Sequence, residues 1–121
     1  MLPAPNRLRE RSDFTSAVRS FGGCRAGSRL LVVHATSTGA RAGLPPRVGF
    51  VVPKAVGGAV VRNRTKRRLR ALVAQRLDGI PTSVDLVVRA NPPAGQASSR
   101  ELQQALDPLL RRVVKGLGGV A

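Results

Sequence analysis

The side chains that usually carry catalysis or hold metals are scarce in this sequence. Its 121 residues include one cysteine, one histidine and six acids, and neither tryptophan nor tyrosine. The lone Cys24 cannot form an internal disulfide, and with His34 as the only histidine a structural zinc site is excluded. The six acids lack the paired spacing that general acid–base catalysis or metal binding needs. We therefore expect no catalytic residue, no metal site and no cofactor bound by the protein alone.

Long apolar runs are missing as well. Residues 1–7 lack the apolar core of a secretory signal, and no segment approaches the ~20 apolar residues of a membrane span. We expect a soluble, cytoplasmic protein without a membrane partner.

Positive charge, by contrast, is abundant. Lys and Arg number 21 against six acids, which gives a formal net charge of +15. Such a charge opposes compaction and is tolerated mainly where phosphate neutralises it. The hydrophobic fraction of 42% is enough for a core of ordinary size. The composition indicates a single RNA-binding domain over residues 1–121, in which we expect residues 1–8 to be flexible and residues 116–121 to form a tail.

Apolar periodicity and turn residues predict the element order α-β-β-β-α-β-α. The expected elements are a helix over residues 13–20, strands over 24–27, 30–35 and 47–52, a helix of about twenty residues after Gly57-Gly58, a strand over 84–89 and a helix after Ser98. This order predicts an α/β (α+β) two-layer sandwich with helices on a small sheet. Strands 30–35 and 47–52 are expected to pair antiparallel through the loop at 36–46.

The last helix carries two local signals. Ser98 and Glu101 have the spacing of a capping box. Pro108 lies inside the apolar pattern and lacks an amide hydrogen, so we expect a kink there or two short helices joined at Asp107.

The densest charge lies in residues 62–70, where six of nine residues are cationic. On a helical wheel one apolar stripe faces the core, and cations occupy most of the remaining surface. The stripe consists of Val61, Thr65, Leu69 and Leu72. Like charges four residues apart repel one another, and no acid lies in this segment to offset them. The helix is therefore expected to bind a polyanion.

The turn before this helix has two possible roles. Gly57-Gly58 either simply begin the helix or let backbone amides approach a phosphate, with Lys54 pointing its charge at the same place. Asn63 either contacts a ribose hydroxyl or orients an arginine, or is an ordinary polar position.

Residues 54–57 and 62–70 together closely resemble the arginine-rich signature of the protein component of bacterial ribonuclease P. The likeness continues in order along most of the chain, through Asn6-Arg7-Leu8, Asp13-Phe14, Arg47-Val48-Gly49 and Asp85-Leu86-Val87-Val88-Arg89 before Pro92. The resemblance implies the fold of the second domain of ribosomal protein S5, with a left-handed β-α-β crossover around the basic helix, against the right-handed rule.

The resemblance also implies an activity and partners. The protein would be the non-catalytic subunit of a ribonucleoprotein endoribonuclease that removes the 5′ leader from precursor tRNA. The chemistry would belong to the catalytic RNA and the Mg²⁺ that this RNA requires. The partners would be that RNA and precursor tRNA, with no obligate protein partner.

Carried over residue by residue, the family's RNA-binding signature falls on Lys54, Arg62, Asn63, Arg64, Lys66, Arg67, Arg68 and Arg70. The family's groove for the single-stranded leader maps to Phe14 and Val18 on the first helix and to Leu31 and Val33 on one strand. Where the family commonly has aromatic residues, this chain has Val18 and Val33. Binding of the leader would therefore depend more on charge and shape than on base stacking.

Two other classes of protein share this charge. One is a structural RNA-binding protein of the ribosome, and the other is a DNA-binding protein with the basic helix in a major groove. A leader groove separates the classes, because a structural protein needs no conduit for a single strand.

Overall fold

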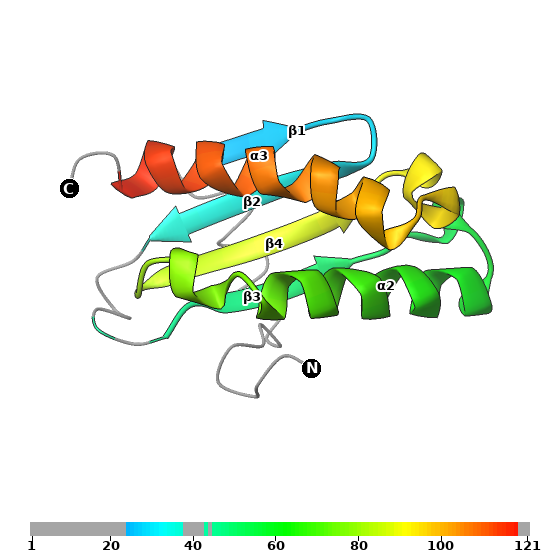
Figure 1. Cartoon of the computed structure of the whole chain (residues 1–121), viewed down its shortest axis with the longest axis horizontal. Coiled ribbons are helices and arrows are strands. Elements are labelled where there is room, and N and C mark those ends of the chain that lie inside the picture. Colours follow the sequence, from blue (N-terminus) through cyan, green and yellow to red (C-terminus); the bar gives the residue numbers. More distant parts are fainter. Residues whose placement is uncertain (1–23, 38–42, 44, 119–121) are drawn as a thin grey trace.

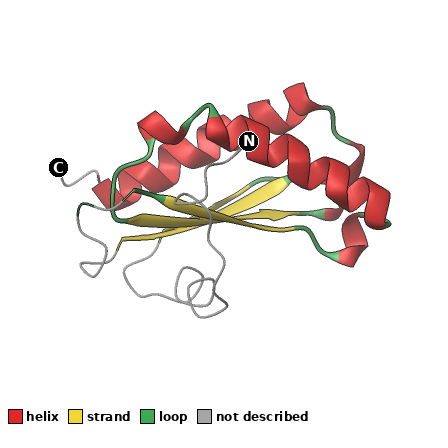
Figure 2. Ribbon diagram, turned by 90° about the horizontal axis from the view of Figure 1, so that it is seen from below, coloured by secondary structure: helices red, strands yellow, loops and turns green. Residues whose placement is uncertain are grey.

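The computed structural model describes residues 24–37, 43 and 45–118 of the chain. Its strands are β1 (Cys24–Gly27), β2 (Leu31–Ser37), β3 (Arg47–Val51) and β4 (Val84–Ala90), its α-helices are α2 (Ala59–Ala74) and α3 (Ser99–Gly118), and its 3₁₀ helices are η3 (Lys54–Val56), η4 (Leu77–Gly79) and η5 (Pro92–Gln96). Both α-helices cover one face of the sheet, so the described chain has two layers (Figures 1 and 2). The helix predicted over 13–20 lies outside the described residues. Residues 116–118, which we expected in a tail, belong to α3.

The sheet has the strand order β1-β2-β4-β3. β4 pairs antiparallel with β2 and parallel with β3. The prediction that strands 30–35 and 47–52 pair directly was therefore wrong, because β4 lies between them. Five consecutive β4 residues, Val84 to Val88, are buried, and a strand buried on both faces belongs at the centre of a sheet.

The connection from β3 through α2 to β4 is a left-handed crossover. Seen from the helix side, both strands run to the right, α2 returns in front of the sheet, and β4 lies above β3 (Figure 1). Most such connections are right-handed. The handedness implied by the family resemblance is thus confirmed.

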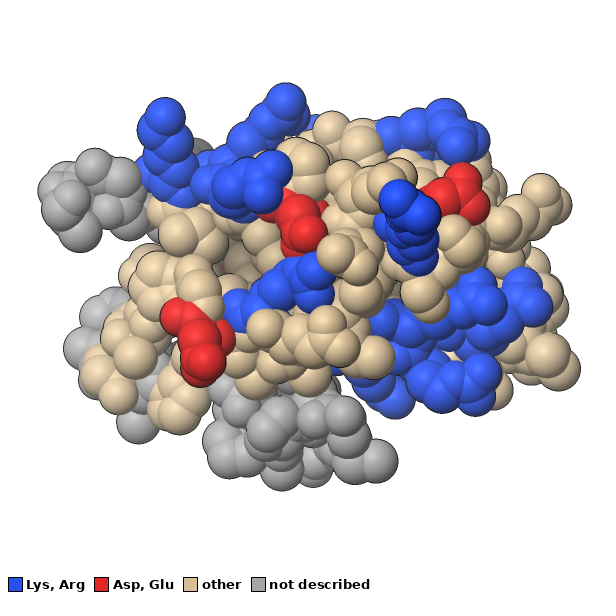
Figure 3. Space-filling model, viewed as in Figure 1, with Lys and Arg blue, Asp and Glu red and all other residues tan. Residues whose placement is uncertain are grey.

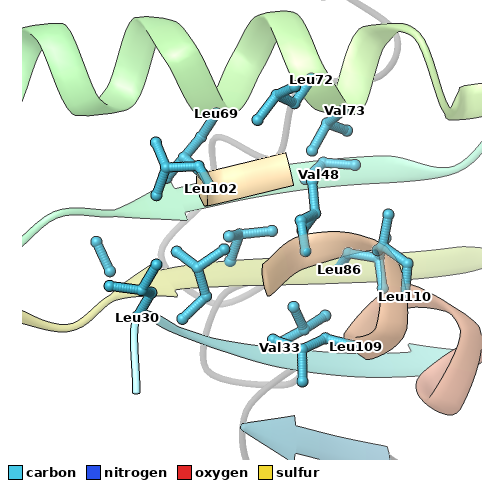
Figure 4. Close-up of a cluster of buried hydrophobic side chains, with 14 of the residues drawn as sticks. Leu30, Val33, Val48, Leu69, Leu72, Val73, Leu86, Leu102, Leu109 and Leu110 are labelled. Carbon is cyan, nitrogen blue, oxygen red and sulfur yellow. The ribbon is translucent and has the colours of Figure 1, made fainter. Parts of the chain in front are cut away.

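The core fills the space between the two layers (Figure 4). Its fully buried side chains include Leu69 and Val73 of α2, Leu102, Leu106 and Leu109 of α3, and Leu31, Val33, Val48, Leu86 and Val88 of the sheet. Strand register explains which sheet side chains reach the core, because residues that pair across neighbouring strands point to the same side of the sheet. The core therefore fixes which face of each strand is covered by helices.

The structure fixes where the two α-helices begin and end. α2 ends at Ala74, and η4 follows it before Ile80-Pro81. α3 begins as predicted with a capping box: the Ser98 amide donates to Glu101 Oε1 at 3.0 Å, and the Glu101 amide donates to Ser98 Oγ at 3.1 Å. α3 is one helix through Pro108, so the alternative of two short helices was wrong. Its buried apolar side chains hold both halves against the sheet despite the missing hydrogen bond.

Candidate nucleic-acid interface

The apolar side of α2 fixes how its cations are presented. Thr65, Leu69 and Leu72 are buried, and Val61 packs partly against the core, as the wheel predicted. The Thr65 hydroxyl donates to the Val61 carbonyl at 2.9 Å, so this buried polar group is satisfied within the helix. The opposite side of α2 is thereby turned to solvent.

That solvent side carries a compact group of cationic and polar side chains. Asn63, Arg67 and Arg70 are exposed and Lys66 is half-buried beside them. These four residues and Ala71 line a hollow of about 440 Å³. Among the described residues no side chain forms an ion pair with them, and Figure 3 shows positive charge gathered over α2. We call Asn63, Lys66, Arg67 and Arg70 the α2 basic face.

Two other arginines of the signature bind the chain itself. Arg64 Nη2 donates to the Gly95 carbonyl at 2.9 Å, and Arg68 Nη1 donates to the Ala97 carbonyl at 2.8 Å. Both side chains are half-buried and point toward η5. Charge density alone could not separate them from the α2 basic face, because their partners lie about thirty residues further along the chain.

The segment that these arginines hold lies against the start of α2. A Cβ added to Gly95 would stand 2.4 Å from the Val56 carbonyl oxygen, so only glycine fits there. Gly57 has φ 155° and its amide donates to the Lys54 carbonyl at 3.1 Å. The Gly57 amide is thus used within the turn, and Lys54 is exposed just before α2.

The structure contradicts the two β2 residues of the predicted leader groove. Leu31 and Val33 are 0% exposed and lie in the core beneath the helices, so the prediction that they line a groove was wrong. Strand alternation gives two candidate faces, and the more apolar one is the one that the helices cover. The half-buried Val32 and His34 occupy the opposite face, which neither α2 nor α3 covers and which we call the open face. Phe14 and Val18 lie outside the described residues.

The open face of the sheet is itself cationic. His34 pairs across the strands with Arg25, and Val32 pairs with Arg89. Burial, and then the charges of Arg25 and Arg89, lower the pKa of His34. An apolar side chain and cations therefore share one surface.

One acid on this face is neutralised. Asp85 is buried, and Arg47 Nη2 lies 2.7 Å from Asp85 Oδ2. The Arg47 guanidinium donates to both carboxylate oxygens. The ion pair joins β3 to β4, and the other charged side chains described on this face, Arg25 and Arg89, are positive.

Other kinds of site find little support in the part of the chain that the structure describes. No three histidine, cysteine or acidic side chains gather there in a position to hold a metal ion. No helix in that part is long and apolar enough to cross a membrane.

The chain is similar to known proteins over most of its length. A family model described as Ribonuclease P matches residues 2–114. The ribonuclease P protein component of Streptomyces bikiniensis is 52% identical over 122 residues, covering 96% of this chain and 98% of that protein. That of Beutenbergia cavernae is 54% identical over 107 residues, covering 88% and 87%. Among solved structures, the RNase P protein of Staphylococcus aureus has a TM-score of 0.76 at 26% identity, covering 90% of this chain and 97% of that one. The RNase P protein of Thermotoga maritima has a TM-score of 0.74 at 27% identity, covering 88% and 96%.

Proposed function

This chain belongs to the ribonuclease P protein family, and from that membership we propose how it engages RNA. Proteins of this family are the protein subunit of a ribonucleoprotein endoribonuclease that matures the 5′ end of tRNA, and its RNA is the catalyst. The alternative of a structural ribosomal protein finds no support in the comparisons. We propose that the α2 basic face binds the catalytic RNA, with precursor tRNA as the substrate.

The observation that carries this proposal is the α2 basic face itself. Its cations are solvent-facing and unpaired among the described residues, and no acid lies on α2. Unpaired cations of this kind bind a polyanion by releasing its condensed counterions. Lys54 and Arg62, which flank the start of this face, stay predicted RNA contacts.

Arg64 and Arg68 have a different proposed role. Their guanidinium groups hold the carbonyls of Gly95 and Ala97, and so tie α2 to the segment that leads into α3. They would orient the α2 basic face and contribute less to RNA contact than the exposed cations do.

We propose that the leader crosses the open face of the sheet. Val32 offers an apolar contact for unstacked bases, while Arg25 and Arg89 offer charge for phosphates. His34 is close enough to both arginines for their charges to lower its pKa. The contribution of Phe14 and Val18 stays a prediction.

The protein's own residues bind and position; they supply no reacting group in this proposal. Mg²⁺ held by the RNA would activate the attacking water and stabilise the displaced oxygen. The chain's cations would neutralise phosphate repulsion between the two RNAs and hold the leader in place. No obligate protein partner is proposed, and the bacterial relatives favour the cytoplasm as the place of action.

Reconstitution tests the function. The purified chain, added to the matching catalytic RNA at low Mg²⁺, should restore cleavage of precursor tRNA. The double variant Arg67→Gln/Arg70→Gln should need more protein for the same rate, whereas Arg100→Gln, an exposed change on α3, should behave like the original chain. Failure of the unaltered chain to restore cleavage would refute the proposed function.

A further inference from the structure

A second hollow lies away from the α2 basic face, between η4 and the C-terminal half of α3, on the side shown in Figure 3. Its volume is about 390 Å³, within the ~300–1,000 Å³ of pockets that hold small ligands. Ile80 and Leu110 are buried at its floor, and Val114 is half-buried beside them. The floor is therefore apolar.

One wall of the hollow is an ion pair. Arg76, just after α2, pairs with Asp107 of α3 and also donates to the Leu72 carbonyl at 2.8 Å. Asp107 is the only acid among the described residues that line the hollow, and Arg76 already neutralises it. The wall thus holds the two helices together and offers no free negative charge.

The rim carries free positive charge. Arg111 and Lys115 line the hollow from successive turns of α3, and both are exposed. Neither forms an ion pair with another described residue. α3 has no acid after Asp107, and the nearby Asp78 is exposed without lining the hollow. A ligand with an apolar face and negative charge at its edge fits this arrangement.

We propose that this η4–α3 hollow binds one unstacked nucleotide of the catalytic RNA. The base would lie against Val114 and the apolar floor, and its flanking phosphates would meet Arg111 and Lys115. Unstacked bases favour such surfaces because their faces are exposed in single-stranded loops and bulges. This inference rests on the proposed RNA-binding function and adds a contact separate from the α2 basic face.

The double variant Arg111→Gln/Lys115→Gln, with both changes at the surface, tests whether these two cations contact phosphates. Affinity of the full chain for the matching catalytic RNA is measured over a range of salt concentrations. The double variant should bind more weakly, and the slope of log K against log salt should flatten by about two phosphate contacts, each worth roughly 0.7–0.9. The matched control is Arg100→Gln/Arg112→Gln, which removes equal charge from exposed positions of α3 outside the hollow and should flatten the slope less.

The variant Val114→Phe tests whether a base enters the hollow, because it fills the hollow without changing charge. It should weaken RNA binding by roughly 5- to 150-fold, the scale of one base stack, and leave the salt slope unchanged. Thermal unfolding of the same variant checks that the chain is still folded. If it is not, Val114→Met replaces it as a smaller filling change.

The outcomes separate this inference from the proposed function. Affinity unchanged in both hollow variants, with Arg67→Gln/Arg70→Gln weakened, would overturn the inference alone. A loss in the charge variant with none in folded Val114→Phe would mean general attraction without a nucleotide site, which also overturns it. Normal binding in all three variants would refute the proposed function as well.

Discussion

At the scale of single residues, the cations of one helix are expected to do two kinds of work. Arg67 and Arg70 are turned to solvent, whereas Arg64 and Arg68 donate to backbone carbonyls near η5. The division follows from their position on the helix, since each row of i, i+4 neighbours faces a different surface. We therefore propose that arginine serves binding in the two rows that contain Arg67 and Arg70, and folding in the row that contains Arg64 and Arg68.

Substitution of the inward pair should lower stability. Arg64→Ala or Arg68→Ala leaves a half-buried carbonyl without its charged donor, which should cost about 1–3 kcal/mol of unfolding free energy. Arg67→Ala should change that free energy little. Denaturant titration of the three variants measures this, and equal stability in all of them would remove Arg64 and Arg68 from their structural role.

The sequence predicts the residues of this helix better than it predicts their partners. The apolar stripe was predicted correctly because it depends only on spacing within the helix. The partners of Arg64 and Arg68 lie in a segment whose approach depends on Gly95 contacting Val56. Such a contact arises from tertiary packing, and no local sequence pattern predicts it.

The imidazole of His34 offers a second test at this scale. Burial, Arg25 and Arg89 lower its pKa, so the folded chain favours the neutral form. Stability should therefore fall as pH drops below the unfolded value of about 6.5. Arg89→Ala should raise the pKa of His34 toward that value, as followed by NMR titration of the ring protons. An unchanged pKa would show that Arg89 does not act on this group.

At the scale of elements, local signals were reliable and pairing was not. The strand at Cys24–Gly27 and the capping box of α3 match their predictions. The pairing of β2 with β3 was wrong, because the run from Val84 to Val88 takes the central position between them. The choice of Leu31 and Val33 for a groove failed for a related reason: alternation shows two faces but does not say which one the helices cover.

The contact between η5 and η3, just before α2, gives a prediction for an element boundary. Gly95→Ala would force a Cβ to within 2.4 Å of the Val56 carbonyl oxygen, so the segment must shift. The shift should also disturb the Arg64 hydrogen bond to the Gly95 carbonyl. Gly79→Ala, where the added Cβ meets open space, is the matched control. Thermal unfolding should show a clearly lower midpoint for Gly95→Ala, and equal midpoints would argue against a tight contact.

At the scale of the whole molecule, the two sides of the sheet are expected to serve different RNAs. Both α-helices lie on one side of the sheet (Figure 2), and that side presents the α2 basic face. The open face carries Val32 with Arg25 and Arg89. A net charge of +15 draws RNA toward the molecule from a distance, but it does not choose between the sides.

A charge placed on the open side should affect one substrate only. Val32→Glu puts a negative charge beside the proposed leader path, so holoenzyme affinity for precursor tRNA should fall while affinity for mature tRNA stays the same. Gln103→Glu, at an exposed site on α3, makes the same charge change on the other side and serves as control. Equal losses for both tRNAs in Val32→Glu would place the leader elsewhere.

The central claim is that the α2 basic face is the contact with the catalytic RNA. Its most direct test is the salt dependence of affinity for that RNA, compared between Arg67→Gln/Arg70→Gln and the inward pair Arg64→Gln/Arg68→Gln. The outward pair should flatten the slope of log K against log salt by about two phosphate contacts, roughly 0.7–0.9 each, while the inward pair should leave the slope of the folded chain nearly unchanged. A slope unchanged in the outward pair, or flattened equally in both, would contradict the account.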